Sequence, residues 1–210
     1  MHGETIVKQK TFYAILIAML ILSAPADLLA GVPTEQVRQT ADRVLAVLQD
    51  SRFKSADKQK ERREQIRQVI ASRFDFPEMA KRSLGSNWQK GSSDEQQQFV
   101  ELFTELLERS YADQIESYDG EKIIYGRENV SQDYADVDTK IVTKKGEQIS
   151  VNYKLRSAGG DWKVYDVVIE NISLVNNFRS QFNRILANGS FSELLKRLQS
   201  KSFDIKPVRS

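Results

Sequence analysis

The sequence contains no cysteine, and its only histidine is His2. Without cysteine the chain forms no disulfide, and no acylated cysteine can tether it to a membrane. Because no histidine follows His2, the rest of the chain lacks the side chains of Ser-His-Asp and Cys-His catalysis and of the usual zinc sites. Carboxylates, lysines and tyrosines remain as possible acids and bases, and we expect neither a metal nor a cofactor.

The first thirty residues have the layout of a secretory signal peptide. Two lysines precede the apolar run FYAILIAMLIL (residues 12–22), and small residues follow it. A membrane anchor is the alternative, but these 11 apolar residues fall short of the roughly 20 that a spanning helix needs. We therefore expect cleavage after Ala26 or Ala30, and a single exported domain over residues 31–210.

Charge is unevenly distributed along the chain, although the net charge is only +2. Residues 51–90 carry 11 Lys and Arg against 5 Asp and Glu, residues 91–140 carry 4 against 13, and residues 141–210 carry 12 against 6. Such blocks are compatible with solvated element faces or with a surface attracted to charged protein or lipid. No nucleic acid is expected as a partner, because the basic residues are not interleaved with stacking aromatics.

Six segments have the apolar spacing of helices. The clearest runs from Ser93 to Tyr118, where one stripe holds three aromatic and three leucine side chains, and Ser92 with Glu95 supplies a capping box. Thr34 is the expected N-cap of the first segment. The other five segments are residues 32–50, the stretch around Ile66 to Ile70, Asp75 to Gly85, Val175 to Leu186, and residues 190–201.

The pattern changes to alternation after Gly120. Apolar and polar residues alternate around residues 137–141 and 149–155, and the turn signals TKKGEQ and SAGGD separate successive segments. This predicts four strands in an antiparallel meander with one solvated face. The fold class is therefore α+β, with helices covering the concave face of a curved sheet.

The stretch from Asp161 to Ile169 is apolar on both sides if it is a strand. Alternation places Trp162, Val164 and Val168 on one face, and Tyr165, Val167 and Ile169 on the other. One face must contact the core. The second face contacts either more core or a ligand, and the periodicity alone does not decide between them.

The sequence gives only weak support for catalysis or for phosphate binding. Asp136 with Asp138, and Asp166 with Glu170, have spacings suited to paired carboxylates, but the first pair lies on the predicted solvent face. Asp166 lies among apolar residues, which favours a structural hydrogen bond over catalysis. The Gly159-Gly160 pair is a hairpin turn, because no phosphate-loop pattern surrounds it.

Two long segments resemble one known family. They are FPEMAKRSLGSNWQKGSSDEQQQFVELFTELLERSYADQIESYDGEKIIY and DWKVYDVVIENISLVNNFRSQFNRIL. They look like the MlaC family, also called the toluene-tolerance family, of periplasmic phospholipid-binding proteins. The resemblance extends from about Val37 to Leu198, and its landmarks include Leu84-Gly85 with Trp88 and Asp161-Trp162.

The resemblance implies a nuclear-transport-factor-like cone, in which a curved antiparallel sheet and its helices enclose a deep apolar pocket for acyl chains. It implies a monomeric periplasmic carrier with phospholipid as cargo and no chemistry on the lipid. The partners it implies are an outer-membrane lipoprotein complex and the MCE-domain subunit of an inner-membrane ABC transporter. Such a shuttle maintains the lipid asymmetry of the outer membrane.

From this resemblance and from the facing directions, we expect twelve residues to line the pocket, although each is equally compatible with ordinary core packing. They are Phe99, Phe103, Leu107, Tyr111, Val151, Tyr153, Trp162, Val164, Val168, Val175, Phe178 and Phe182. Two positions depart from the family pattern, which has Gly near Asn171 and Tyr near Phe178. A small hydrolase or isomerase that uses Asp166 or a tyrosine, and an adaptor that binds protein through residues 51–90, remain the alternatives.

Overall fold

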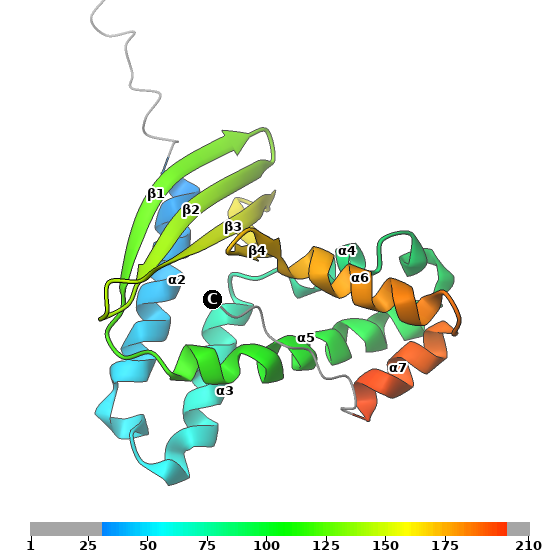
Figure 1. The fold of residues 1–210 in the computed structure, drawn as a ribbon, viewed down its shortest axis with the longest axis horizontal. Helices are drawn as coiled ribbons and strands as arrows, with labels where there is room; N and C mark the ends of the chain where they lie inside the picture. The colour runs from blue at the N-terminus through cyan, green and yellow to red at the C-terminus, as the bar shows by residue number, and fades with distance from the viewer. Residues whose placement is uncertain (1–30, 201–210) are drawn as a thin grey trace, which may run out of the picture. The chain divides into compact units, whose positions relative to one another are not determined.

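The computed structural model describes residues 31–200, so the predicted signal peptide in residues 1–30 lies outside the described residues. Within that range, no helix is both long enough and apolar enough to cross a bilayer. The α+β class is confirmed, with helices first, then strands, then helices (Figure 1). The elements are α2 (Val32–Gln49), α3 (Gln59–Ala71), α4 (Phe76–Leu84), α5 (Ser93–Glu116), β1 (Lys122–Ser131), β2 (Tyr134–Val142), β3 (Gln148–Ala158), β4 (Asp161–Ile169), β5 (Ile172–Ser173), α6 (Leu174–Leu186) and α7 (Phe191–Gln199).

Helix ends follow local capping chemistry. The predicted capping box of α5 is confirmed, since the Ser92 side chain accepts from the Glu95 N–H and the Glu95 side chain accepts from the Ser92 N–H. Asp75 likewise caps α4. The prediction for Thr34 is wrong, because α2 already begins at Val32 and places Thr34 inside the first turn. There the Thr34 N–H donates to a Glu128 carboxylate oxygen of β1 at 2.7 Å.

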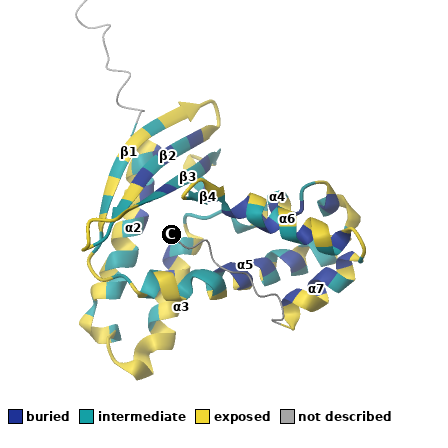
Figure 2. Cartoon of the chain, in the orientation of Figure 1, coloured by how far each residue is buried: buried dark blue, intermediate teal, exposed yellow. Residues whose placement is uncertain are grey.

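The five strands form one antiparallel sheet in sequential order. Directly opposed residues share a face, so the row Tyr125, Thr139, Val151 and the pair Val137, Tyr153 lie on the same side. We call this side the inner face, because its central residues are buried, and the opposite side the outer face. Figure 2 shows the alternation of buried and more exposed residues along the strands.

β4 carries a β-bulge at Tyr165. Lys154 of β3 pairs with Asp166, but the next residue of β3, Leu155, pairs with Val164. Tyr165 is the extra residue between these two pairs. Because a bulge inserts one residue, the alternation of faces beyond it is reversed relative to an unbroken strand.

The bulge corrects the predicted faces of this strand. Trp162 and Val164 lie on the inner face before the bulge, and Val167 lies on the inner face after it. Val168 pairs with Asn152 and therefore lies on the outer face. The expectation that Val168 shares a face with Trp162 and Val164 is wrong. The strand reads as apolar on both sides because Trp162 and Val164 lie inward before the bulge, and Val167 and Ile169 lie inward after it.

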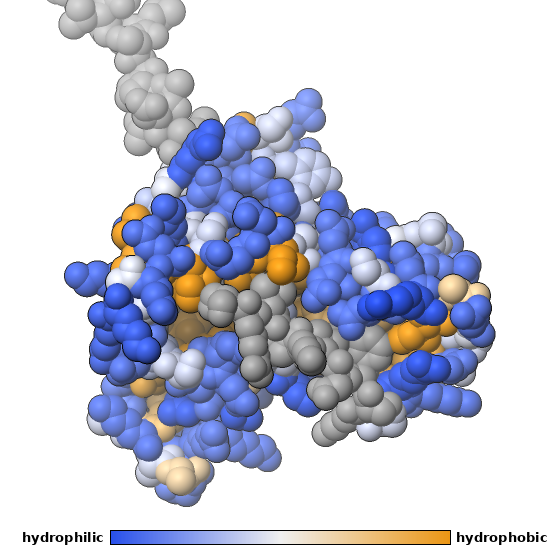
Figure 3. All heavy atoms as spheres, in the orientation of Figure 1, coloured by the Kyte–Doolittle hydropathy of each residue, from blue (hydrophilic) through white to orange (hydrophobic). Residues whose placement is uncertain are grey.

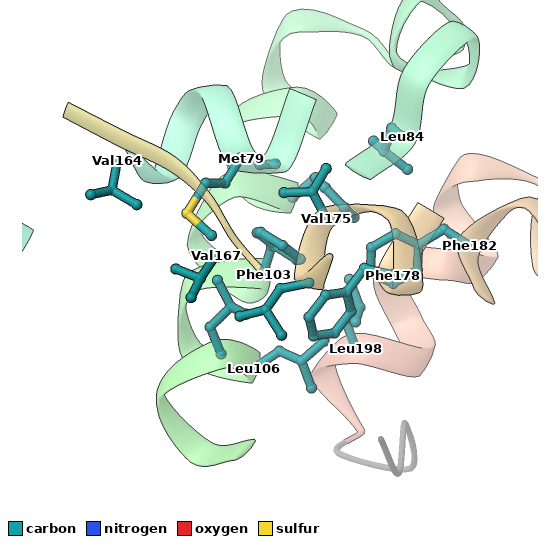
Figure 4. Packing of buried hydrophobic residues seen from close by; sticks show 14 of the residues in the cluster. Met79, Leu84, Phe103, Leu106, Val164, Val167, Val175, Phe178, Phe182 and Leu198 are labelled. Carbon is teal, nitrogen blue, oxygen red and sulfur yellow. The ribbon is translucent and has the colours of Figure 1, made fainter. Parts of the chain in front are cut away.

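The helices pack in two places. α2 lies against the strands, and α4, α6, α7 and α5 pack on one another beside β4 (Figure 1). One cluster of buried apolar residues joins these helices to the inner face of the sheet. Figure 4 shows its centre, where Met79 of α4 and Val167 of β4 lie close to Phe103 and Leu106 of α5.

Candidate functional site

Five predicted site residues form a closed aromatic cluster between α5 and α6. Phe99, Phe103, Phe178 and Phe182 have 0% exposure, and Val175 has 3% (Figure 4). The Phe103 and Phe178 rings meet edge to face with centroids 5.1 Å apart, and the Phe99 and Phe182 rings do so at 5.4 Å. Such pairs add attraction beyond area burial. The structure therefore brings these five residues together, with their surfaces covered by one another and by neighbouring core residues.

Four more predicted residues lie on the inner face of the sheet. Val151 and Val164 are buried, whereas Tyr153 and Trp162 are half-buried. Tyr153 combines two properties that Tyr125 and Tyr165 also have. It keeps accessible surface, yet burial raises the pKa of its hydroxyl. A side chain that faces a sheltered interior surface has both properties, and one that points into open solvent does not.

The remaining helical pair lies further along α5. Leu107 is buried, and Tyr111, one helical turn later, is half-buried and packs against the core. The exposure of the α5 stripe therefore increases from Phe99 towards the C-terminal end of the helix. This end of α5 is followed directly by β1, so the less buried part of the stripe lies near the beginning of the sheet.

Half-buried apolar side chains continue from Tyr153 over the inner face of the first three strands. Because they are shielded by the core and still accessible, they form a surface that the chain itself does not fully cover. Apolar atoms are visible between the strands and α5 in Figure 3. We call these residues the inner apolar surface: Ile123, Tyr125, Ile141, Ile149 and Tyr153 of the sheet, with Tyr111 of α5.

The outer face of the sheet is polar around Val168. Val168 borders a shallow hollow of about 280 Å³, which is otherwise lined by charged and amide side chains of β1, β2 and β3. Among them, the Lys154 ammonium lies 3.0 Å from an Asp136 carboxylate oxygen. Val168 is therefore separated from the other predicted site residues.

Asp166 holds the start of α6. Its Oδ1 accepts the Val175 N–H at 3.1 Å, and its Oδ2 accepts the Ser173 hydroxyl. Ser173 in turn caps the helix by accepting the Asn176 N–H at 3.0 Å. Asp166 is 6% exposed, and these bonds compensate its burial. The predicted structural role of Asp166 is confirmed.

Part of the basic block and part of the acidic block of the sequence form ion pairs with each other, between α3 and α5. A groove of about 890 Å³ separates α3 from the C-terminal half of α5, and arginines of α3 span it. The Arg62 guanidinium lies 2.7 Å from Glu116, Arg63 also pairs with Glu116, and Arg67 lies 2.7 Å from Glu108. The sequence left two alternatives for these charges, solvated helix faces or a surface that attracts a charged partner. Neither describes α3 and α5 fully, because several of their charged side chains pair with each other across the groove.

Glu116 takes part in two of these three ion pairs. Burial by itself would raise its pKa, but hydrogen bonds from Arg63, Gln59 and Arg62 outweigh it and hold the pKa of the carboxyl below its usual value. The Glu116 side chain is only 10% exposed, so solvent screens these pairs less than it screens ordinary surface pairs. We call the four residues Arg62, Arg63, Arg67 and Glu116 the α3–α5 clasp.

Comparison with known proteins identifies the fold family. A family model described as MlaC protein matches residues 38–200. The chain belongs to the MlaC family. Among curated proteins, it is 23% identical over 175 residues to the intermembrane phospholipid transport system binding protein MlaC of Haemophilus influenzae, with 81% of this chain and 82% of that protein covered. It is 24% identical over 169 residues to the toluene tolerance protein ttg2D of Pseudomonas putida, covering 78% and 79%.

A solved structure of similar fold comes from Ralstonia solanacearum. It is described as a phospholipid-binding protein in complex with a phospholipid. The TM-score is 0.72 at 25% identity, and the alignment covers 80% of this chain and 96% of that one. The similarity therefore includes nearly all of a protein that was crystallised with lipid.

The two departures of this MlaC-family chain have structural explanations. Asn171 has φ of +65° and, with Glu170 at +47°, forms the two-residue loop between the paired residues Ile169 and Ile172. Hairpin loops of this length need positive φ at both positions, which Asn tolerates well. Phe178 is fully buried among other rings. A hydroxyl there would need a polar partner inside an aromatic cluster.

Sequence reasoning missed three features of the site region. It did not anticipate the bulge at Tyr165, the short strand β5, or the position of Tyr125 on the inner apolar surface. For Tyr125 the signal was present, since Ile123 and Tyr125 alternate in KIIYG and must share a face. For β5 the signal was Asn171 between two isoleucine-containing segments. No residue pattern in the sequence predicts the bulge.

Proposed function

We propose that this protein is a phospholipid carrier that moves lipid between two membranes. The observation that carries the proposal is the inner apolar surface, which is shielded by the core and left accessible by the chain itself. Acyl chains gain about 25 cal/mol for each Å² of apolar area that they bury against such a surface. The named function of the Haemophilus influenzae relative and the lipid-bound state of the Ralstonia solanacearum protein support this reading.

We place the acyl chains along the inner apolar surface, in contact with Val151, Trp162 and Val164 where these border it. Leu107 and Tyr111 of α5 face them from the helical side. The aromatic cluster of Phe99, Phe103, Val175, Phe178 and Phe182 forms the closed end, and Val168 is excluded because it lies on the outer face. The phosphate stays near the mouth, because burying it without partners would cost several kcal/mol or more.

We further propose that the chain is exported, that residues 1–30 are removed, and that residues 31–210 act as one periplasmic domain. The partners in this scheme are an outer-membrane lipoprotein complex and the MCE-domain subunit of an inner-membrane ABC transporter. A carrier needs one membrane-bound partner at each end of its path. Incubation of lipid-loaded protein with each purified partner, followed by lipid counting, tests both.

A catalytic use of Asp166 is disfavoured by its contacts. Both of its oxygens already accept hydrogen bonds from the start of α6. A general base must reach the proton of a substrate within hydrogen-bonding distance. To do so, Asp166 would have to release the helix that it positions.

The direct test is the lipid content of the protein. Protein purified from cells without added lipid should carry diacyl phospholipid, seen as a bound mass in native mass spectrometry and as phospholipid in an organic extract. Protein that is free of lipid and takes up none from phospholipid vesicles would contradict the proposal.

A matched pair of variants tests the location. Ile123 points to the inner face and is half-buried, whereas its neighbour Ile124 points to the outer face and is 51% exposed. Ile123→Glu should abolish lipid loading, because it places a charge among acyl chains. Ile124→Glu makes the same chemical change and should load normally. Far-UV circular dichroism of both variants checks that they are folded, and equal loading of two folded variants would exclude this face.

A further inference from the structure

Tyr125 of β1 carries a buried hydroxyl without a hydrogen-bond partner among the described residues. Its side chain lies on the inner face, opposite Thr139 of β2. A buried hydroxyl without a partner destabilises the folded protein, and a phenylalanine would fill the same space without this cost. The hydroxyl is therefore better explained by a ligand atom than by packing.

The surroundings of Tyr125 favour a neutral phenol that donates a hydrogen bond. Burial is the main cause that raises the pKa of Tyr125 to about 12, and the neighbouring Tyr153 contributes to the same rise. At neutral pH both tyrosines are therefore protonated. Tyr153 lies on the same inner face of the sheet, opposite Val137 of β2. Two phenol donors thus lie near each other within the inner apolar surface.

Arg38 of α2 lies between the Tyr125 ring and the solvent. Its guanidinium carbon lies 4.3 Å from the centre of the Tyr125 ring, and the Arg38 side chain is 47% exposed. The contact holds the ring by a cation–π interaction. A ligand at the Tyr125 hydroxyl would therefore have its apolar part along the sheet and its charged part towards Arg38 and water.

We propose that the Tyr125 hydroxyl donates a hydrogen bond to an ester carbonyl oxygen of the bound phospholipid, with Tyr153 beside it as a second donor. The inference rests on the proposed function, because it requires a phospholipid in this place. The ester is the polar group at the junction of acyl chains and headgroup, and it is an uncharged acceptor. An uncharged acceptor fits a buried phenol better than the phosphate does, since the phosphate keeps its water near Arg38.

A competition experiment separates the ester from the rest of the lipid. Delipidated protein is loaded with a fluorescent phospholipid, which is then displaced by diester phosphatidylethanolamine or by its diether analogue of equal chain length. The diether lacks the carbonyl oxygens and keeps the phosphate and the chains. Wild-type protein should bind the diester more tightly by about 3- to 10-fold for the hydrogen bond of Tyr125, and by a smaller additional factor for that of Tyr153.

Tyr125→Phe should lower diester affinity by the same factor and leave diether affinity unchanged. Tyr153→Phe should give the same pattern with a smaller factor. Tyr134→Phe is the matched control, because Tyr134 is 48% exposed on the outer face of β2 and should behave as wild type. An unchanged diester preference in Tyr125→Phe, or equal weakening with both lipids, would overturn the inference. Wild-type protein that binds neither lipid would instead refute the proposed function.

Discussion

The bulge at Tyr165 makes a quantitative prediction about two valines. Val164 is 1% exposed on the inner face, and Val168 is half-buried beside the polar outer hollow. Threonine has the shape of valine but replaces one methyl group with a hydroxyl. At Val164 that hydroxyl enters an apolar environment, which costs about 1–3 kcal/mol in the free energy of unfolding. At Val168 it reaches water and polar neighbours, so the change should be within about 0.5 kcal/mol.

Urea unfolding of delipidated protein, followed by far-UV circular dichroism, measures both changes. The midpoint for Val164→Thr should fall at constant slope, and the thermal midpoint should fall by about 2–4 °C for each kcal/mol. Val168→Thr should unfold like wild type. Equal destabilisation of the two variants, or a larger effect at Val168, would mean that the strand alternates without a bulge and that our assignment of faces is wrong.

Two further predictions concern carboxylates. Asp166→Asn should destabilise the protein by about 1–3 kcal/mol, because the amide NH2 that replaces one carboxylate oxygen is a donor and cannot accept the second hydrogen bond from the start of α6. Asp136→Asn, which alters an exposed ion pair of the outer face, should cost less than about 1 kcal/mol. Equal costs of the two variants in denaturant unfolding would contradict the helix-positioning role of Asp166. Glu116→Gln should weaken the α3–α5 clasp, and it should also flatten the acid branch of the stability curve. The folded-state pKa of Glu116 lies below its unfolded value of about 4.3, so the contribution of this carboxylate is present above that value and is lost as the pH falls through the folded-state pKa. An acid branch identical to that of the exposed-site control Glu101→Gln would contradict this assignment.

Much of the fold was predictable because local chemistry specifies it. The capping box at Ser92 and Glu95 and the aromatic stripe of α5 act over a few residues, and both are found where they were predicted. The turn signals between strands fixed the antiparallel meander for the same reason. Thr34 is not the N-cap because α2 begins two residues earlier, at Val32. There the Thr34 N–H donates to Glu128, which is 94 positions away, and no local rule describes that contact.

The positions of the twelve expected residues were more predictable than their exposure. Eleven of the twelve expected residues lie on the inner face or in the helices packed beside it. Periodicity could not tell the packed aromatic cluster around Phe103 from accessible positions such as Tyr153, because both repeat at the same spacing. The exposure of a side chain depends on what covers it, and the covering elements are distant in the sequence.

The sequence by itself determined the element order, the α+β class, the absence of cysteine and histidine chemistry, and the family resemblance. Each depends on composition or on patterns within one segment. Only the tertiary structure decided that Trp162 and Val164 before the bulge and Val167 and Ile169 after it share the inner face, since a bulge is set by how β4 pairs with β3. Only the tertiary structure brought the basic α3 against the acidic α5 and left the Tyr125 hydroxyl buried without a partner among residues 31–200. Pairing register and long-range contacts depend on two separate segments at once, so the sequence of either segment alone does not predict them.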